Sequence, residues 1–426
     1  MNGPPEARAG DASAPEAPRT WVQQIASALT HRNYRILWLA ALGSTIGTWM
    51  QSYAQSWLVF DLTHSNFYLG LDSFLGQLPI LLLMLIGGVI ADRHDRRRLL
   101  TGSQYVQAFS AFTLALLVAT GQVTITAIFL LSFLSGCGQA FGGPAYQAMI
   151  PSLVPRRDLP NAVALNSTQF NLSRVLGPLL GGLVLVWFSV GWCFTLNGLS
   201  FFIVVVALAS LRLPPHVPST SPRALKAELK KGLRYVRDTP LLMVLTGLAF
   251  LTTFLAMPIA TFFPSFATDV LTGGQTPAQR LAMLMASQGL GAIAGALIVG
   301  SRGRFPQMGR ALLVVQILLG LFVALFAMSR SLPLSLLLIF ISGMCSMAVF
   351  SMCFSLVQLT APDDLRGRIV SIYMVALRGG WPLGGLAAGA LADRFSAPTV
   401  MMASAGLLSV IAAALLVRRH GTLTQA

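Results

Sequence analysis

GGVIADRHDRRR (residues 87–98) joins two long apolar stretches, 66–91 and 99–120. Each stretch is long enough to cross a bilayer, which takes ~20 residues in helical form. Hydrocarbon offers no hydrogen bonds to the backbone, so a chain that crosses it forms helices. The quoted segment therefore reads as a short, arginine-rich turn between two membrane-spanning helices.

Apolar stretches of this kind recur along the whole chain. Of the 426 residues, 55% are hydrophobic and only 10% are charged, against about 25% charged in soluble domains. We predict an all-α integral membrane protein with twelve transmembrane helices, arranged as two six-helix pseudo-repeats. The expected spans are 35–60, 66–91, 99–120, 123–148, 162–187, 190–211, 241–266, 279–300, 309–329, 332–358, 368–392 and 397–417.

The formal charge of +15 is concentrated in every second gap between these spans. The intervening gaps hold only Arg280, Arg330 and Arg394. Cytoplasmic loops carry such an excess of arginine and lysine, so we expect a multi-pass protein of the cell membrane with both termini cytoplasmic. Anionic lipids are then the expected partner of the basic loops, and nucleic acid is not.

The one long gap divides the chain. We expect a cytoplasmic N-terminal tail and bundle, a cytoplasmic linker, a second bundle and a cytoplasmic tail. Their ranges are 1–32, 33–212, 213–240, 241–417 and 418–426.

The linker contains a helical pattern. Leu225, Leu229, Leu233 and Val236 recur at helical spacing, with lysine and arginine between them. A basic amphipathic helix of this type lies on a membrane surface. A solvent-exposed linker helix is the alternative.

The two predicted bundles resemble each other in sequence. RVLGPLLG (174–181) matches RGGWPLGG (378–385) in its arginine, proline and final glycine. Six-helix halves related as a parallel repeat are typical of transporters, with the substrate site between them at mid-membrane.

The residues of the arginine-rich turn segment, 87–98, have a direct chemical interpretation. Gly88 lets a neighbouring helix approach closely. Asp92, at the cytoplasmic end of the second span, can accept hydrogen bonds from the amino terminus of a helix, and the eleventh span offers one. Arg93, Arg96 and Arg97 can bridge to carboxylates or lipid phosphates.

Gly88-x-x-x-Asp92-Arg93-x-x-Arg96-Arg97 resembles the signature of the major facilitator superfamily. In that superfamily the loop latches the two halves in the outward-open state. Asp95 departs from the signature, which has glycine there. The whole segment is similar to that of the branch of macrolide-efflux and enterobactin-export proteins, as are WLVFDLT (57–63) and KGLRYV (231–236).

A second motif lies in the fifth span. GPLLGG (177–182) resembles the antiporter motif of the superfamily, which is associated with export. Ala164 and Ser173 stand where the family has glycine, and generic packing of small residues is the alternative. The residues concerned are Gly177, Pro178, Gly181 and Gly182.

Three ionisable residues lie well inside the expected spans: Asp72, Arg174 and Arg378. Charges are unfavourable in lipid and usually face a cavity or pair with one another. Asp72 is a candidate for proton coupling, for a structural hydrogen-bonded site, or for an outer vestibule. For the two arginines, we favour pairing with helix ends or polar cavity groups over substrate contact.

Polar side chains in the presumed cavity helices are weaker candidates. A mixed amide and aromatic lining suits a bulky amphipathic compound, while hydrogen bonding between helices explains each residue equally well. The cavity candidates are Gln51, Gln55, Gln139, Tyr146, Gln169 and Gln288.

The sequence lacks the motifs of an enzyme. It has no phosphate-binding loop, no HExxH and no GxSxG, and its histidines are scattered, so we expect no cofactor and no metal. We expect proton-coupled export of a small amphipathic molecule, such as a drug or a siderophore-like metabolite, by rocking of the two halves. The alternatives are an uptake or facilitative carrier, and a non-transporting membrane scaffold or receptor.

Overall fold

The computed structural model describes residues 27–211, 225–272, 274–303, 305–362 and 365–417. The predicted C-terminal tail lies outside these residues, as do the N-terminal tail apart from residues 27–32 and the start of the predicted linker. The described chain is helical and holds no β-strand, with one isolated bridge between Thr272 and Ser331.

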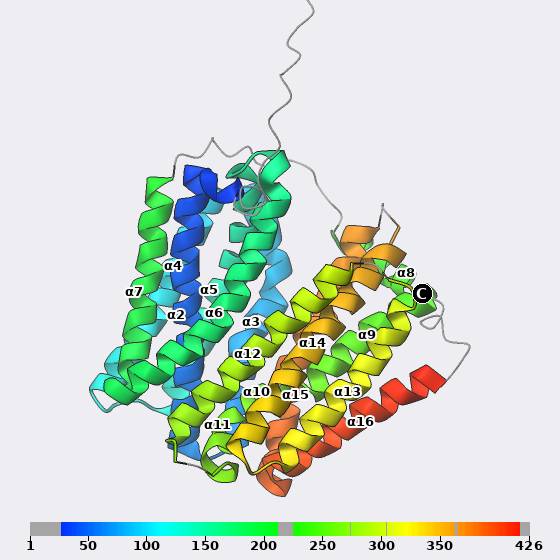
Figure 1. The fold of residues 1–426 in the computed structure, drawn as a ribbon. Coiled ribbons are helices and arrows are strands. Elements are labelled where there is room, and N and C mark those ends of the chain that lie inside the picture. The colour runs from blue at the N-terminus through cyan, green and yellow to red at the C-terminus, as the bar shows by residue number, and fades with distance from the viewer. Residues whose placement is uncertain (1–26, 212–224, 273, 304, 363–364, 418–426) are drawn as a thin grey trace, which may run out of the picture.

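Long helices follow one another along the chain (Figure 1). They are α2 (Arg32–Thr63), α3 (Asn66–Arg93), α4 (Arg96–Ala119), α5 (Ile125–Met149), α6 (Leu159–Trp187), α7 (Val190–Ser210), α8 (Leu225–Asp238), α9 (Pro240–Leu255), α12 (Pro277–Arg302), α13 (Met308–Met328), α14 (Leu332–Thr360), α15 (Arg366–Phe395) and α16 (Ala397–Val417). Shorter pieces are η1 (Ser27–Thr30), η2 (Ile150–Ser152), η3 (Arg156–Asp158), α10 (Pro258–Thr261), α11 (Phe263–Ser265) and η4 (Phe266–Val270).

Polar residues at the turns fix where the helices begin. The Thr124 side chain accepts a hydrogen bond from the Ala127 backbone at the start of α5. Thr276 and Gln279 form a capping box at the start of α12, followed by Pro277 in the first turn. These groups satisfy backbone donors that a helix leaves open at its first turn.

Eleven segments of the described chain are long and apolar enough to cross a membrane. The predicted all-helical membrane fold is confirmed to this extent. Helix α2, which covers the predicted span 35–60, is not among the eleven. Its middle carries Gln51, Ser52, Gln55 and Ser56, which lower its mean hydropathy. The twelfth crossing therefore stays a prediction.

The predicted span 241–266 falls within one apolar segment, Pro240–Val270, that is long enough to cross a membrane, and the helix is broken inside this segment. Helix α9 ends at Leu255, and the short α10, α11 and η4 follow it. Pro258 and Pro264 stand at the starts of α10 and α11. Proline has no N–H to give to the preceding turn and its ring clashes there, so each proline starts a new segment.

The helices form two groups, α2–α7 and α9–α16, that lie side by side (Figure 1). The groups meet at the lower end of the view and diverge towards the upper end. We call the upper end the basic face, because it carries η1, α8 and the α3–α4 turn, and the other end the opposite face. Helix α3 packs on α15, and α6 packs on α12, across the two groups.

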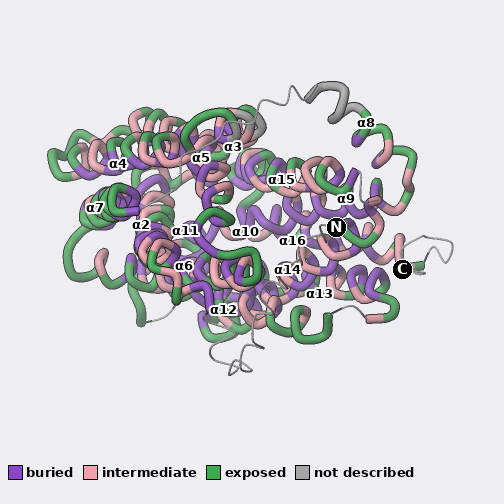
Figure 2. The backbone as a smooth tube through the Cα atoms, turned by 90° about the horizontal axis from the view of Figure 1, so that it is seen from above, coloured by how far each residue is buried: buried purple, intermediate pink, exposed green. Residues whose placement is uncertain are grey.

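Buried residues follow the helix surfaces that meet inside the molecule, while exposed residues line its perimeter (Figure 2). One large apolar cluster spans both groups towards the opposite face, with Tyr53, Phe263 and Phe326 among its members. Tyr53 also joins the groups directly, since its hydroxyl donates to the Ala278 carbonyl over 2.8 Å.

Glycines set the spacing between α3 and α15. A Cβ atom on Gly70 would overlap the Gly385 carbonyl, and one on Gly389 would lie 2.6 Å from the Asn66 carbonyl oxygen. Further along, Gly379 lies near Leu81. The helices are therefore antiparallel, and they touch backbone to backbone towards the opposite face.

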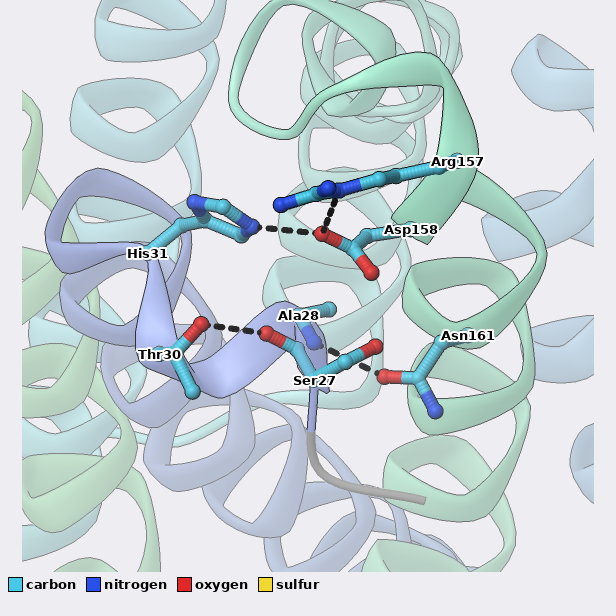
Figure 3. A network of polar contacts seen from close by, with 7 residues as sticks. All are labelled: Ser27, Ala28, Thr30, His31, Arg157, Asp158 and Asn161. Carbon is cyan, nitrogen blue, oxygen red and sulfur yellow. Dashed lines mark hydrogen bonds and ion pairs between the residues drawn. The ribbon is translucent and has the colours of Figure 1, made fainter. Parts of the chain in front are cut away.

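On the basic face, a polar network ties the start of α2 to the start of α6 (Figure 3). The His31 ring Nε2 lies 2.8 Å from the buried Asp158 carboxylate, which also lies 3.8 Å from Arg157 Nε. The Ala28 N–H donates to the Asn161 side chain over 2.9 Å. This network holds η1 against the first group.

Helix α8 lies within the predicted linker. Its Gly232 rests on Arg368 and Ile372, near the start of α15, and Val236 is buried. Leu233 is exposed, and the side chains of Leu225 and Leu229 lie outside the described residues. That α8 lies on a membrane surface stays a prediction.

Candidate functional site

The Asp72 carboxylate is the centre of a polar cluster inside the first group. Ser132 of α5 donates to its Oδ1 over 2.6 Å, and Gln55 of α2 donates to its Oδ2 over 2.7 Å. Gln55 Nε2 also lies 2.8 Å from the Ser132 hydroxyl oxygen. Two helices, α2 and α5, thus present hydrogen-bonding groups to one half-buried carboxyl group on α3.

Two glycines bring these helices together. One turn beyond Asp72 and Ser132 lie Gly76 and Gly136, and a Cβ atom on Gly136 would overlap the Gly76 carbonyl. Close contact of small residues is how membrane helices approach. The cluster can hold a charged or a neutral carboxyl group, because Gln55 and Ser132 each carry both a donor and an acceptor.

A second polar site joins the two helix groups. Arg174 Nη2 of α6 donates to Gln288 Oε1 of α12 over 3.2 Å. The guanidinium also lies 5.7 Å from the centre of the Trp49 ring, within the range of a cation–π interaction. Trp49 in turn meets Phe170 edge-on, with ring centres 5.7 Å apart.

The charge of Arg174 is not neutralised by an acid. Within the described part of the chain, no carboxylate pairs with it. A buried or half-buried cation without an acid is unfavourable unless polar groups or a ligand stabilise it. Here the stabilising groups are one amide and one aromatic ring.

A cavity of about 20 Å³ lies beside this pair. Met257, Met347 and Phe350 contribute apolar walls, together with Arg174 and Gln288. Gln288 is only 4% exposed, and in the described structure its Nε2 is a buried donor without a partner. The volume suffices for about one water molecule, so the site is closed around its polar groups in this conformation.

The third intramembrane charge, Arg378, takes a different place from its sequence counterpart Arg174. It lies on α15 next to Gly379 and is exposed. Asp72, Arg174 and Arg378 therefore do not pair with one another in the described structure.

Two arginines of the arginine-rich turn segment, 87–98, bind the ends of helices in their own group. Arg96 donates to the Ala148 carbonyl over 2.8 Å, at the end of α5. Arg97 donates to Ala209 over 2.8 Å and to Leu211 over 3.4 Å, at the end of α7. Carbonyl groups at a helix end lack intrahelical donors and attract cations. Arg93 is exposed.

Asp95 caps the start of α4, where its Oδ1 accepts from the Arg97 backbone N–H over 2.9 Å. This explains an aspartate where the superfamily signature has glycine. The close helix approach in this segment occurs at Gly87, where a Cβ atom would overlap the Ala140 carbonyl, while the space beside Gly88 is open. Asp92 lies in the last turn of α3, and its side chain is outside the described residues.

The GPLLGG motif (177–182), in α6, contacts both helix groups. Cβ atoms on Gly177 and Gly181 would meet Trp49 and Tyr53 of α2, in the same group. A Cβ atom on Gly182 would lie 2.7 Å from Ala282 of α12, in the other group. Pro178 is buried within α6.

The remaining cavity candidates make contacts within the first group. Gln51 accepts from Asn197 over 2.7 Å, and Gln169 donates to Thr45 over 3.0 Å. Tyr146 donates to Asn166 over 3.3 Å, and Gln139 is exposed. Only Gln55 and Gln288 belong to the two polar sites described above.

Sequence reasoning missed Ser132, and it missed a carboxylate near the end of α15. Asp393 accepts hydrogen bonds from the Ser65 hydroxyl and the Asn66 backbone. A signal was available, since Gly389 and Asp393-Arg394 repeat the spacing of Gly88 and Asp92-Arg93.

Known proteins resemble the chain over almost its whole length. A family described as "Transmembrane secretion effector" matches residues 24–423. The enterobactin exporter EntS of Escherichia coli O1:K1 / APEC is 26% identical over 355 residues, covering 83% of this chain and 84% of that protein.

Solved transporters share the fold. The nucleoside transporter NupG superposes with a TM-score of 0.71 at 15% identity, over 91% of this chain and 99% of that one. A bacterial homolog of the human lysosomal transporter Spinster, inward-facing and unoccupied, gives a TM-score of 0.70 at 16% identity, over 90% and 96%. These relatives are an exporter and two transporters, and none of them is an enzyme.

Proposed function

The chain belongs to the transmembrane secretion effectors of the major facilitator superfamily, and on that premise we propose that it exports a small amphipathic molecule by proton antiport and alternating access. Membership makes it a multi-pass membrane transporter. Direction, coupling ion and substrate class are the parts that we propose.

The observation that carries the proposal is the bond between Arg174 and Gln288. It lies between the two helix groups, beside a small cavity with methionine and phenylalanine walls. Substrate sites of such transporters lie between the halves at mid-membrane. A cation among apolar groups favours an amphipathic substrate that carries a negative or acidic group.

The arrangement of the helices supports alternating access. We propose that α2 is the twelfth crossing, and that 33–212 and 241–417 are two six-helix bundles joined by the linker. The basic face would be cytoplasmic, with both termini there and anionic lipids against its arginines. The two groups meet at the opposite face and diverge towards the basic face, which fits an inward-facing state.

Asp72 is the proposed proton-coupling group. It is a carboxyl group within a membrane helix, and its two partners can accommodate either protonation state. It lies in the interior of the first bundle, apart from the Arg174 site. Protonation would therefore act on substrate binding through the packing of α2, α3 and α5.

The remaining motifs have proposed roles in the same cycle. Asp92 would latch α3 to the start of α15 in the outward-open state, and Arg96 and Arg97 would keep α5 and α7 in register with it. Gly182 would let α6 and α12 approach each other.

Uptake by the same fold is the second candidate. It is favoured by Ala164 and Ser173, which replace glycines of the export-associated motif. A scaffold or receptor that transports nothing is the third.

Flux measurements separate these functions. Purified protein would be reconstituted in liposomes loaded with a fluorescent aromatic sulfonate, and an inside-acid or outside-acid gradient would be imposed. Export by antiport predicts that the dye moves against the proton flow and that an uncoupler stops it. Movement of dye and protons in the same direction supports uptake instead, and no movement under any gradient for a panel of anionic and neutral dyes contradicts transport of this class.

A further inference from the structure

Asp393 joins the end of α15 to the beginning of α3. Its Oδ2 accepts from the Ser65 hydroxyl over 2.5 Å and from the Phe67 N–H over 3.3 Å. Its Oδ1 accepts from the Asn66 N–H over 2.8 Å. All three hydrogen bonds cross from one helix group to the other at the opposite face.

The chemistry of these contacts is that of a helix cap supplied by another helix. The first N–H groups of a helix have no intrahelical acceptor, and the helix dipole attracts negative charge there. The side chain of Ser65, the N-cap residue of α3, accepts from the Tyr68 N–H over 3.5 Å. Asp393 therefore takes the two earlier backbone donors.

A glycine makes the contact possible. Gly389 lies one turn before Asp393, and a Cβ atom there would lie 2.6 Å from the Asn66 carbonyl oxygen. A larger residue would push the end of α15 away from α3, and with it the carboxylate.

The same pattern occurs at the other end of this helix pair. Gly88-x-x-x-Asp92-Arg93 ends α3, and Gly389-x-x-x-Asp393-Arg394 ends α15. Because the two helices are antiparallel, each ends on the face where its partner begins. Each thus carries an aspartate in its last turn, at the level of the partner's first N–H groups.

We propose that Asp393 is the latch that closes the opposite, outer face in the inward-facing state. Asp393 holds the start of α3, and Asp92 holds the start of α15 after the halves have rocked. Only one of the two contacts forms in each state, so the helix pair works as a reciprocal switch. This inference rests on the alternating access proposed above, and it makes Asp393 a positioning residue that touches no substrate.

The contact is suited to opening and closing. Asp393 is exposed, and its neighbour Ala392 and its partner Asn66 line a cavity of about 310 Å³. Water can therefore replace the hydrogen bonds when the halves part. A carboxylate at an exposed helix start changes an equilibrium by a factor of about two to five, which biases the two states without locking either.

The test measures the two states directly in the full-length protein. Spin labels on cysteines at Gln122 and Arg330 report the opposite face, and labels at Arg156 and Arg310 report the basic face, since these positions are exposed and lie in different groups. The four native cysteines would be replaced by alanine: Cys137, Cys193, Cys345 and Cys353. Distance distributions are recorded in liposomes without substrate.

Asp393→Ala should raise the population with an open opposite face by about two- to fivefold, together with closure of the basic face. Asp393→Glu should restore part of the original distribution, and Ser65→Ala should cause a smaller shift because the backbone donors remain. The matched control is Asp61→Ala, which removes another exposed carboxylate near the same face. Asp92→Ala should remove the proposed contact on the basic face and so shift the populations the opposite way. The double variant of Asp92→Ala and Asp393→Ala should return towards the original distribution.

An unchanged distribution in Asp393→Ala, or an equal shift in Asp61→Ala, overturns the latch. The readout needs no substrate, so it is separate from the transport assay. Two states that interconvert normally in Asp393→Ala remove this role and leave the proposed function intact. A single state in every variant and in the unmodified protein removes alternating access itself, and the latch with it.

Discussion

Arg174 Nη2 lies 3.2 Å from Gln288 Oε1, and this bond connects a helix of the first group to a helix of the second. The same guanidinium rests near the Trp49 ring. A ligand that takes the Nη2 donor of Arg174 would therefore replace a contact between the groups, which would link binding to the relative position of the two halves.

Arg174→Gln should weaken binding of an anionic amphipathic dye by about ten- to a hundredfold, because a hydrogen bond to a charged group contributes roughly 1.5–3 kcal/mol. Arg174→Lys should bind with intermediate affinity, since it keeps the charge and loses the fork of donors. Quenching of tryptophan fluorescence measures the affinity. Arg156→Gln, on an exposed arginine, is the control, and an equal loss for a neutral amide of the same dye would contradict recognition of charge.

Asp72→Asn should reduce gradient-driven efflux at least about tenfold and leave dye binding within about twofold, because the amide keeps hydrogen-bonding groups but cannot exchange a proton. The residual efflux should no longer depend on pH across the neutral range. Stopped-flow efflux from liposomes gives both quantities. Asp238→Asn, at an exposed site on α8, should behave like the unmodified protein. A normal pH profile in Asp72→Asn would remove the residue from coupling.

Gly136→Ala should lower the free energy of unfolding by about 1–3 kcal/mol, because its new Cβ atom would overlap the Gly76 carbonyl between α5 and α3. The apparent Tm of the purified protein in detergent reports the change. Gly102→Ala is the matched control. It lies in α4 with no atom within 4 Å of a built Cβ, so it should stabilise slightly or have no effect. Equal Tm values for the two variants would contradict the close packing.

Arg97→Gln should loosen the end of α7, because Arg97 donates to the carbonyl oxygens of Ala209 and Leu211. Hydrogen exchange of the peptide that ends α7 should rise by about five- to tenfold, which corresponds to roughly 1 kcal/mol. Arg98→Gln provides the control in the adjacent residue, whose side chain is 91% exposed and lies 3.8 Å from Asp95. Surface pairs of this type contribute little. Equal exchange in both variants would show that Arg97 does not hold α7.

Hydropathy and turn chemistry predicted most of the helices, because length and apolar composition determine what can cross a bilayer. The break after α9 was missed, although Pro258 and Pro264 signalled it. A pattern of apolar residues predicts a span by hydropathy alone and takes no account of the backbone N–H group that proline lacks. Helix α2 shows the converse, since its polar residues bond inside the bundle, as Gln51 does with Asn197.

The sequence predicted which residues belong to the candidate site, but not which of them contact one another. Asp72, Arg174, Gln55 and Gln288 stood out because polar groups are rare in membrane helices. Which of them meet depends on how six or more helices pack, and no local pattern specifies that. Asp393 was overlooked because it lies at a helix end, where a carboxylate needs no special explanation until its neighbour is known.

The backbone contact of Gly70 with Gly385 has a consequence for how fast the protein works. Glycines have no side-chain rotamers that must change when the helices move. At this contact α3 can therefore rotate against α15 with little internal friction. The slow steps of turnover should then be the breaking of the hydrogen bonds at the helix starts and the release of the substrate. Movement at the glycine contact between α3 and α15 should be fast.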